Sequence, residues 1–146
     1  MSNEMNGQPT AMFWVLAIFF LLFNAIGLFF YYMQMTMTEE ILVANFTPEQ
    51  QEFMRNIPVW ATSAYALAVN SGVLASILLL LRKAWAVPLY VFSFVCVLIQ
   101  DLDAFLLSDG IGVWGTSGLY LPITVIVVCI AEIWYSRKAR ADGIIA

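Results

Sequence analysis

Residues 59–107 read VWATSAYALAVNSGVLASILLLLRKAWAVPLYVFSFVCVLIQDLDAFLL, two long apolar segments separated by a short basic turn at Arg82 and Lys83. The first segment, residues 59–81, makes roughly 35 Å of α-helix, enough to cross a hydrocarbon core of ~30 Å. The second, residues 84–107, is of similar length, and its Pro88 lies near the start, where a missing N–H costs least. This stretch therefore predicts a hairpin of two transmembrane helices.

Two more apolar segments extend the hairpin to a four-span protein. The 146 residues are 62% hydrophobic and 11% charged, whereas a soluble domain is about half apolar and about a quarter charged. Residues 11–33 lack the basic start and the cleavage site of a signal peptide, so we interpret them as an uncleaved span. With residues 119–135 as the last span, the chain is predicted to be all-α, a four-helix transmembrane bundle in one integral membrane domain, residues 1–146.

The connection at residues 34–58 is predicted to carry a short amphipathic helix. Thr47 can cap this helix by accepting from the backbone N–H of Gln50, whose side chain can reach back in return. Residues 48–56 place apolar side chains on one side, so we expect them to lie on the membrane surface or to cap the bundle. Residues 38–44 are expected to add another turn or two of helix.

The charge distribution predicts the orientation of the spans. Five of the six basic residues follow the second or the fourth span, and only Arg55 lies in the connections on the other side. The positive-inside rule then places both termini in the cytoplasm, and residues 34–58 and 108–118 outside. The five basic residues are Arg82, Lys83, Arg137, Lys138 and Arg140.

Residues 1–10 are polar and are interpreted as a loose tail.

Residue types and motifs argue against enzyme chemistry. The chain has no histidine, which is the usual general base and a common haem and zinc ligand. Cys96 and Cys129 lie deep in apolar segments, where we expect small buried hydrophobes rather than a disulfide. The glycine-rich residues 108–118 lack the Lys-Ser/Thr that completes a phosphate-binding loop. We therefore expect a non-enzymatic protein with no cofactor, metal or nucleic-acid partner.

Two amides are predicted to lie near the middle of the membrane. Asn70 falls at the centre of the second span, and Asn24 lies near the middle of the first. An unpaired amide in hydrocarbon is costly, so each is expected to face protein or a wet cavity. Either Asn24 and Asn70 form a midplane binding site with Gln100, or they make interhelical hydrogen bonds worth ~0.6 kcal/mol.

A stripe of small residues marks one face of the second span. Its members recur every four residues, and this spacing lets a neighbouring helix approach closely. We expect the contact inside the bundle, although a contact between subunits fits the same pattern. The stripe consists of Ala64, Ala68, Gly72 and Ser76.

The third span ends in polar residues that have two interpretations. Asp101 and Asp103 point about 200° apart on a regular helix, whereas Gln100 and Asp103 share a face. Gln100 and Asp103 either recognise a polar solute or a cation at the outer mouth, or simply lie in water at the headgroups.

Glu132 is the only acidic residue clearly inside the fourth span. One interpretation is a proton-coupling carboxylate. The other, which we favour from the sequence, is a side chain that reaches the cytoplasmic interface and pairs there with a basic residue. The candidate partners are Arg82, Lys83 and Arg137.

Several short motifs give the chain a resemblance to a known family. They are FNAIG at residues 23–27, FTPEQ at 46–50, PVW at 58–60, GVLAS at 72–76 and LLLLR at 78–82. With these motifs the chain resembles a family of small four-span bacterial inner-membrane proteins that automated naming often calls sugar transporters. The resemblance implies a multi-pass protein of the bacterial inner membrane that carries a small solute, and it implies no residue roles.

Two functional hypotheses fit these features. In the leading one, the chain is a small-solute, sugar-like transporter that acts as an oligomer, since four packed helices leave little room for a pathway through one copy. In the other, it is a non-enzymatic accessory or structural subunit that packs against a larger membrane complex through the small-residue stripe or the aromatic first span. The predicted substrate site consists of Asn24, Asn70, Gln100 and Asp103.

Overall fold

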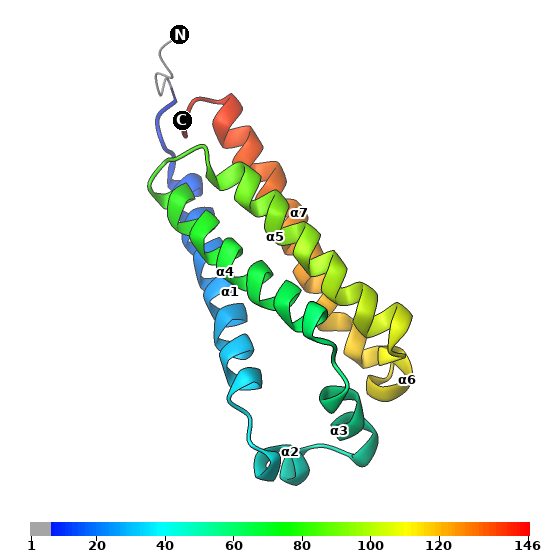
Figure 1. Ribbon diagram of the computed structural model, residues 1–146. Helices are drawn as coiled ribbons and strands as arrows, with labels where there is room; N and C mark the ends of the chain where they lie inside the picture. The colour runs from blue at the N-terminus through cyan, green and yellow to red at the C-terminus, as the bar shows by residue number, and fades with distance from the viewer. Residues whose placement is uncertain (1–6) are drawn as a thin grey trace.

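The computed structural model describes residues 7–146, and every regular element within that range is helical (Figure 1). Four stretches are long and apolar enough to cross a membrane: Ala11–Met35, Val59–Leu80, Ala86–Leu107 and Thr116–Ala141. The predicted all-α four-helix bundle is confirmed, and its long helices are those of a multi-pass membrane protein.

The long helices are joined at one end of the bundle by short ones, and the third span changes its helix type before it ends. The long helices are α1 (Ala11–Met35), α4 (Val59–Leu80), α5 (Ala86–Asp101) and α7 (Tyr120–Ala141). The short elements are α2 (Glu39–Asn45), α3 (Pro48–Arg55), the π-helix η1 (Leu102–Leu107), α6 (Gly110–Trp114) and the 3-10 helix η2 (Thr116–Leu119).

The helix α3 begins where the sequence predicts, because its capping box forms. Thr47 Oγ1 accepts from the Gln50 N–H at 3.3 Å, and Gln50 Oε1 accepts from the Thr47 N–H at 3.1 Å. Thr38 caps α2 by accepting a backbone N–H of its first turn at 3.3 Å. An ion pair between Glu39 and Arg55 then joins these two short helices.

The helix α7 is longer than the predicted span of residues 119–135, because its last turns remain helical. Ser136 and Ala139 of these turns are buried against the bundle. Lys138 and Arg140 lie in the last turn of α7, where their positive charges interact favourably with the negative end of the helix dipole. The fourth span therefore reaches Ala141.

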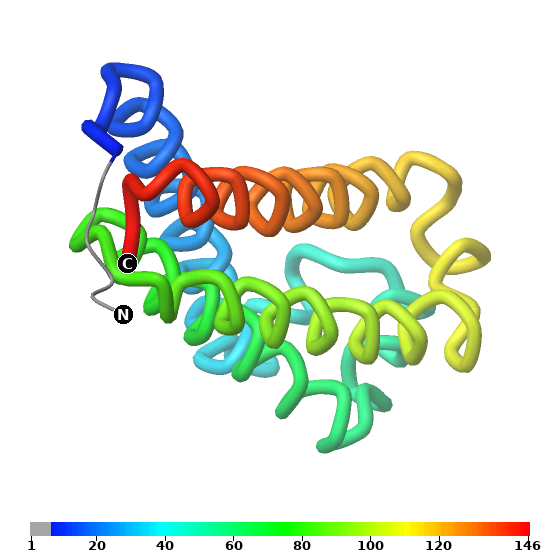
Figure 2. The backbone as a smooth tube through the Cα atoms, turned by 90° about the horizontal axis from the view of Figure 1, so that it is seen from above, coloured from blue at the N-terminus to red at the C-terminus, as the bar shows by residue number. Residues whose placement is uncertain are grey.

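The bundle is built on the central antiparallel pair α4 and α5, with α1 packed on α4 and α7 packed on α5. Figures 1 and 2 show the start of α1, the C-terminus and the 82–84 turn at one end, which we name the terminal end. The short helices α2, α3 and α6 lie at the other end, the cap end. The rings of Phe13 and Tyr135 lie 6.4 Å apart where α1 and α7 meet, and the two helices diverge toward the cap end (Figure 1).

The main hydrophobic core fills the terminal end. Phe13, Phe20 and Tyr135 are at most 7% exposed and pack in one cluster with residues of all four long helices. A smaller cluster lies among α4, α5 and α7 and contains Cys96 and Cys129, which are buried and free, as the sequence predicts.

The two chain ends close the terminal end further. The backbone of Ala146 makes hydrogen bonds of 3.0 and 3.1 Å to the turn at residues 82–84. The Arg82 guanidinium donates to a carbonyl of the C-terminal residues at 2.8 Å and to the Gly7 carbonyl at 3.1 Å. The predicted loose tail at residues 1–10 is therefore wrong at Gly7, and its residues 1–6 lie outside the described residues.

Candidate functional site

Two adjoining cavities lie between the middle of the bundle and the cap end. The cap cavity, of about 230 Å³, lies beneath the short helices α3 and α6. The bundle cavity, of about 360 Å³, lies between α1, α4, α5 and α7. Gln34, Tyr65 and Gln100 line both, so the two cavities meet at these three side chains.

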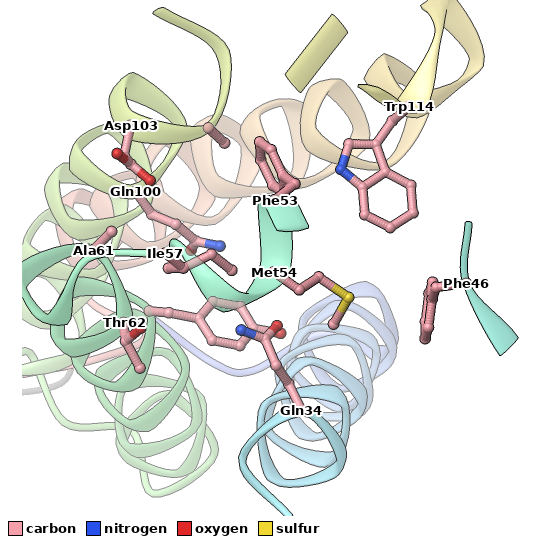
Figure 3. Close-up of a pocket in the computed structure, with 12 residues that line it drawn as sticks. Gln34, Phe46, Phe53, Met54, Ile57, Ala61, Thr62, Gln100, Asp103 and Trp114 are labelled. Atoms are coloured by element: carbon pink, nitrogen blue, oxygen red, sulfur yellow. The ribbon is translucent and has the colours of Figure 1, made fainter. Parts of the chain in front are cut away.

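The cap cavity combines aromatic rings with amide groups. The Trp114 indole stands edge-on to the rings of Phe46 and Phe53, with centroid distances of 6.1 Å to each. Figure 3 shows the side chains of Gln34 and Gln100 extending into the same cavity. Apolar walls with a few convergent polar groups are typical of small-molecule sites.

A π-helical turn, η1, begins just after Asp101, and π-helical turns occur frequently at functional sites. Asp103 lines the cap cavity together with Gln100, is 5% exposed and accepts from the Ser108 hydroxyl at 3.1 Å. Asp101 lines the bundle cavity instead, and its Oδ2 is buried with no hydrogen-bond partner among residues 7–146. The predicted common face of Gln100 and Asp103 is confirmed, and the interpretation of Asp103 as a carboxylate in open water is wrong.

Four side chains, one from each long helix, close the bundle cavity toward the terminal end. Asn24 Nδ2 donates to Glu132 Oε1 at 2.5 Å and lies 3.3 Å from Ser76 Oγ. Ser76 Oγ in turn lies 2.8 Å from the Tyr90 hydroxyl. Gly72 makes room for this arrangement, because a Cβ there would overlap Asn24 Oδ1. We name Asn24, Ser76, Tyr90 and Glu132 the floor cluster.

Glu132 lies deeper in the bundle than the interfacial position that we favoured from the sequence. Its side chain is 1% exposed, and within residues 7–146 it forms no ion pair, so the expected pairing with a basic residue is wrong. The reason is the length of α7, which continues roughly 14 Å beyond Glu132 at 1.5 Å per residue. A carboxyl group held inside a membrane bundle is costly and usually marks a functional position.

Asn70 does not belong to the site. Its side chain is exposed on the outer face of α4 and lines neither cavity, so within one chain it does not face protein or a wet cavity as expected. Its Nδ2 donates to the Ala66 carbonyl one turn earlier at 2.7 Å. This local bond satisfies part of the amide's hydrogen-bonding capacity without a second helix.

The small-residue stripe of α4 is buried inside the bundle of a single chain. Ala64, Ala68 and Ser76 are at most 5% exposed, and Gly72 is buried between Asn24 of α1 and α5. The close approach that the stripe predicts thus occurs within the bundle, where it brings the floor cluster together.

Several residues of the two cavities carried no signal in the sequence. Gln34, Tyr65 and Trp114 lie near the ends of their helices, where an interfacial position explains an amide or an aromatic ring equally well. Ser93 lines the bundle cavity and donates to the Ala68 carbonyl at 2.7 Å, but one serine in a span is unremarkable. Only the convergence of four helices identifies these residues as neighbours.

No family model, curated protein or solved structure matches this chain. The resemblance to small four-span bacterial proteins therefore stays a prediction that rests on the short motifs.

Proposed function

We propose that this chain is a small-solute membrane transporter whose solute enters from the cap end. The observation that supports the proposal is the one-sided shape of the bundle. Two cavities with polar groups extend from the short helices to Asn24 of the floor cluster. Beyond the floor cluster, the helices pack around aromatic side chains that exclude a pathway. A site that is accessible from one side and sealed on the other is what alternating access requires of each end state.

The sealed side has a specific structure. Phe20 packs edge-on to Tyr90 and Tyr135, with ring centroids 6.2 and 6.3 Å apart. Phe20 and Tyr135 lie in the main core with Phe13 and with Tyr90, the floor-cluster residue that joins the floor to this core. A transport cycle would have to separate α1 from α7 here, and the Asn24–Glu132 hydrogen bond joins the same two helices.

The proposed orientation follows from the basic residues. The segments 82–83 and 137–140, which contain the five basic residues, lie at the terminal end (Figure 1). The positive-inside rule therefore supports a cytoplasmic terminal end and an outward-facing cap end, in a bacterial inner membrane as the resemblance implies. The solute would then approach from outside.

The cavities also bear on the oligomeric state. An oligomer is predicted from the sequence because four packed helices leave little room for a pathway through one copy. A single chain holds a cavity of about 360 Å³, comparable with the smaller pockets that hold small molecules. The transporter proposal therefore does not require a partner copy, and homo-oligomerisation stays a separate prediction.

Solute uptake by purified protein in proteoliposomes tests this proposal. The assay uses a panel of radiolabelled neutral sugars and small organic amines, with the variants Gly27→Leu and Asn70→Leu. Gly27 lines the bundle cavity, and a Cβ there meets only Val69 Cγ1 at 3.6 Å, so a leucine fits the backbone and fills the cavity. Asn70→Leu changes the outer face and serves as the matched control.

The expected result is uptake of at least one solute above empty liposomes, lost in Gly27→Leu and kept in Asn70→Leu. Equal uptake by the Gly27→Leu protein would contradict a pathway through the bundle cavity. The competing accessory-subunit hypothesis gains support if no solute is taken up and native mass measurement shows stable co-purification with unrelated membrane subunits.

A further inference from the structure

One wall of the bundle cavity is apolar. Phe23 and Phe30 of α1 and Leu121 and Val125 of α7 line it. The two helices diverge toward the cap end (Figure 1), and Leu121 is 64% exposed. This part of the cavity suits the apolar body of a ligand.

The ionisable groups that line the two cavities and form the floor cluster are carboxyl, phenol and thiol groups, none of which carries a positive charge. Asp101 lines the cavity, and Asp103 lines the adjoining one. Glu132 lies behind Asn24 in the floor cluster. No lysine or arginine lines either cavity within residues 7–146. An anionic ligand would meet carboxyl groups and no cation, which excludes it on electrostatic grounds.

The Asp101 carboxyl supplies the specific recognition element. Asp101 lines the cavity, and its Oδ2 is buried and has no hydrogen-bond partner among the described residues. A buried acceptor without a partner carries a desolvation penalty that a ligand donor removes. A charged donor makes the strongest such bond, because charge-assisted hydrogen bonds are roughly twice as strong as neutral ones.

The rest of the site selects an organic cation over a metal ion. Within residues 7–146 no group of three or more acidic, cysteine or histidine side chains is placed to hold a metal. Aromatic rings of Phe23, Phe30 and Tyr65 line the cavity instead, and such rings attract ammonium groups and pack against apolar bodies. The Gln100 side chain at the junction of the two cavities adds a neutral acceptor.

We infer that the bundle cavity binds a small amphipathic amine, with its ammonium group on Asp101 and its apolar body between α1 and α7. This inference specifies the substrate class of the proposed transporter. It rests on the proposed function only in calling the bound amine a substrate. The binding itself is an equilibrium property of the cavity.

Isothermal titration calorimetry of the protein in lipid nanodiscs tests the inference. The probes are 2-phenylethylammonium, the neutral analogue 2-phenylethanol, and glucose, with empty nanodiscs as the partition blank. The wild type is compared with Asp101→Asn and with the control Asp142→Asn, which removes an exposed carboxylate that lines neither cavity. Circular dichroism checks that both variants are folded.

The expected result is saturable binding of the ammonium probe, weakened at least about tenfold by Asp101→Asn and little changed by Asp142→Asn, as loss of one charge-assisted bond predicts. The alcohol should bind at least about tenfold more weakly than the amine. Equal affinity for amine and alcohol in the wild type overturns the inference even if the Asp101 variant does not fold. Saturable binding of glucose without binding of the amine also overturns it, but leaves the transporter proposal standing. Amine binding without uptake in liposomes would support the binding site on Asp101 and leave the transporter proposal without support.

Discussion

The hydrogen bond between Asn24 and Glu132 joins the first and last spans at the floor of the bundle cavity. Asn24→Leu removes the donor and leaves the buried Glu132 carboxyl group without this hydrogen bond. We expect the free energy of unfolding to fall by about 1–3 kcal/mol, the cost of an unsatisfied buried polar group. The measurement is reversible unfolding in mixed micelles, followed by circular dichroism.

The double variant Asn24→Leu/Glu132→Leu is the control for this prediction. Because it removes both partners, it should be less destabilised than the sum of the two single variants, by about 0.6 kcal/mol or more. Strictly additive losses would show that the two side chains do not stabilise each other.

Gly72 is the residue that lets Asn24 reach the floor cluster. A Cβ at Gly72 would overlap the Asn24 carboxamide, whereas a Cβ at Gly27 meets only Val69 at ordinary contact distance. Gly72→Ala should lower the free energy of unfolding by about 1–3 kcal/mol, as overpacking does. Gly27→Ala, a matched change in another helix of the same bundle, should be neutral or raise it by up to about 1 kcal/mol. A Gly72→Ala protein as stable as the Gly27→Ala protein would mean that α1 shifts freely away from α4.

At the residue scale the sequence identified kinds of polar groups but not the side of the helix they occupy. Asn24 and Asn70 are both amides near mid-span, so both were expected to face protein or a wet cavity. The rotation of each helix about its axis separates them, since close packing along Gly72 turns Asn24 inward and leaves Asn70 exposed. That rotation depends on contacts between distant segments, which local pattern does not contain.

At the scale of elements, the short helix α3 tests how far local signals act. Its capping box was predictable because every partner lies within four residues of Thr47. Thr47→Ala should weaken the start of α3 by about 1 kcal/mol, and hydrogen exchange of its first amides should speed up accordingly. Thr38→Ala, which removes the equivalent cap of α2, should leave exchange in α3 unchanged. Faster exchange in α3 for both variants would indicate that the two helices unfold as one unit.

Other elements depended on signals that no local pattern carries. The π-helix after Asp101 and the helix α6 within the glycine-rich connection form where distant segments meet at the cap end. The last turns of α7 are held by the burial of Ser136 and Ala139 against the bundle. Apolar length therefore predicted the number of spans, while tertiary packing set where the third changes helix type and where the fourth ends.

At the scale of the whole molecule, one end of the bundle is packed and the other is hollow. The terminal end holds the main core and the C-terminal residues, whose backbone is tied to the 82–84 turn. The cap end holds both cavities and the diverging ends of α1 and α7. The floor cluster lies at the boundary between the packed end and the hollow end. Substitutions in this cluster should therefore alter both the free energy of unfolding and the access of solute to the bundle cavity.

The direction of this asymmetry in the membrane is a further testable property. In a background with Cys96→Ala and Cys129→Ala, both buried positions, Ser117→Cys exposes a thiol at the cap end and Ala141→Cys exposes one at the terminal end. A membrane-impermeant maleimide should label Ser117→Cys on intact spheroplasts, and should label Ala141→Cys only after the membrane is opened, because the positive-inside rule predicts a cytoplasmic terminal end. The reverse pattern would place the cavities on the cytoplasmic side, and the proposed solute would then approach from inside the cell.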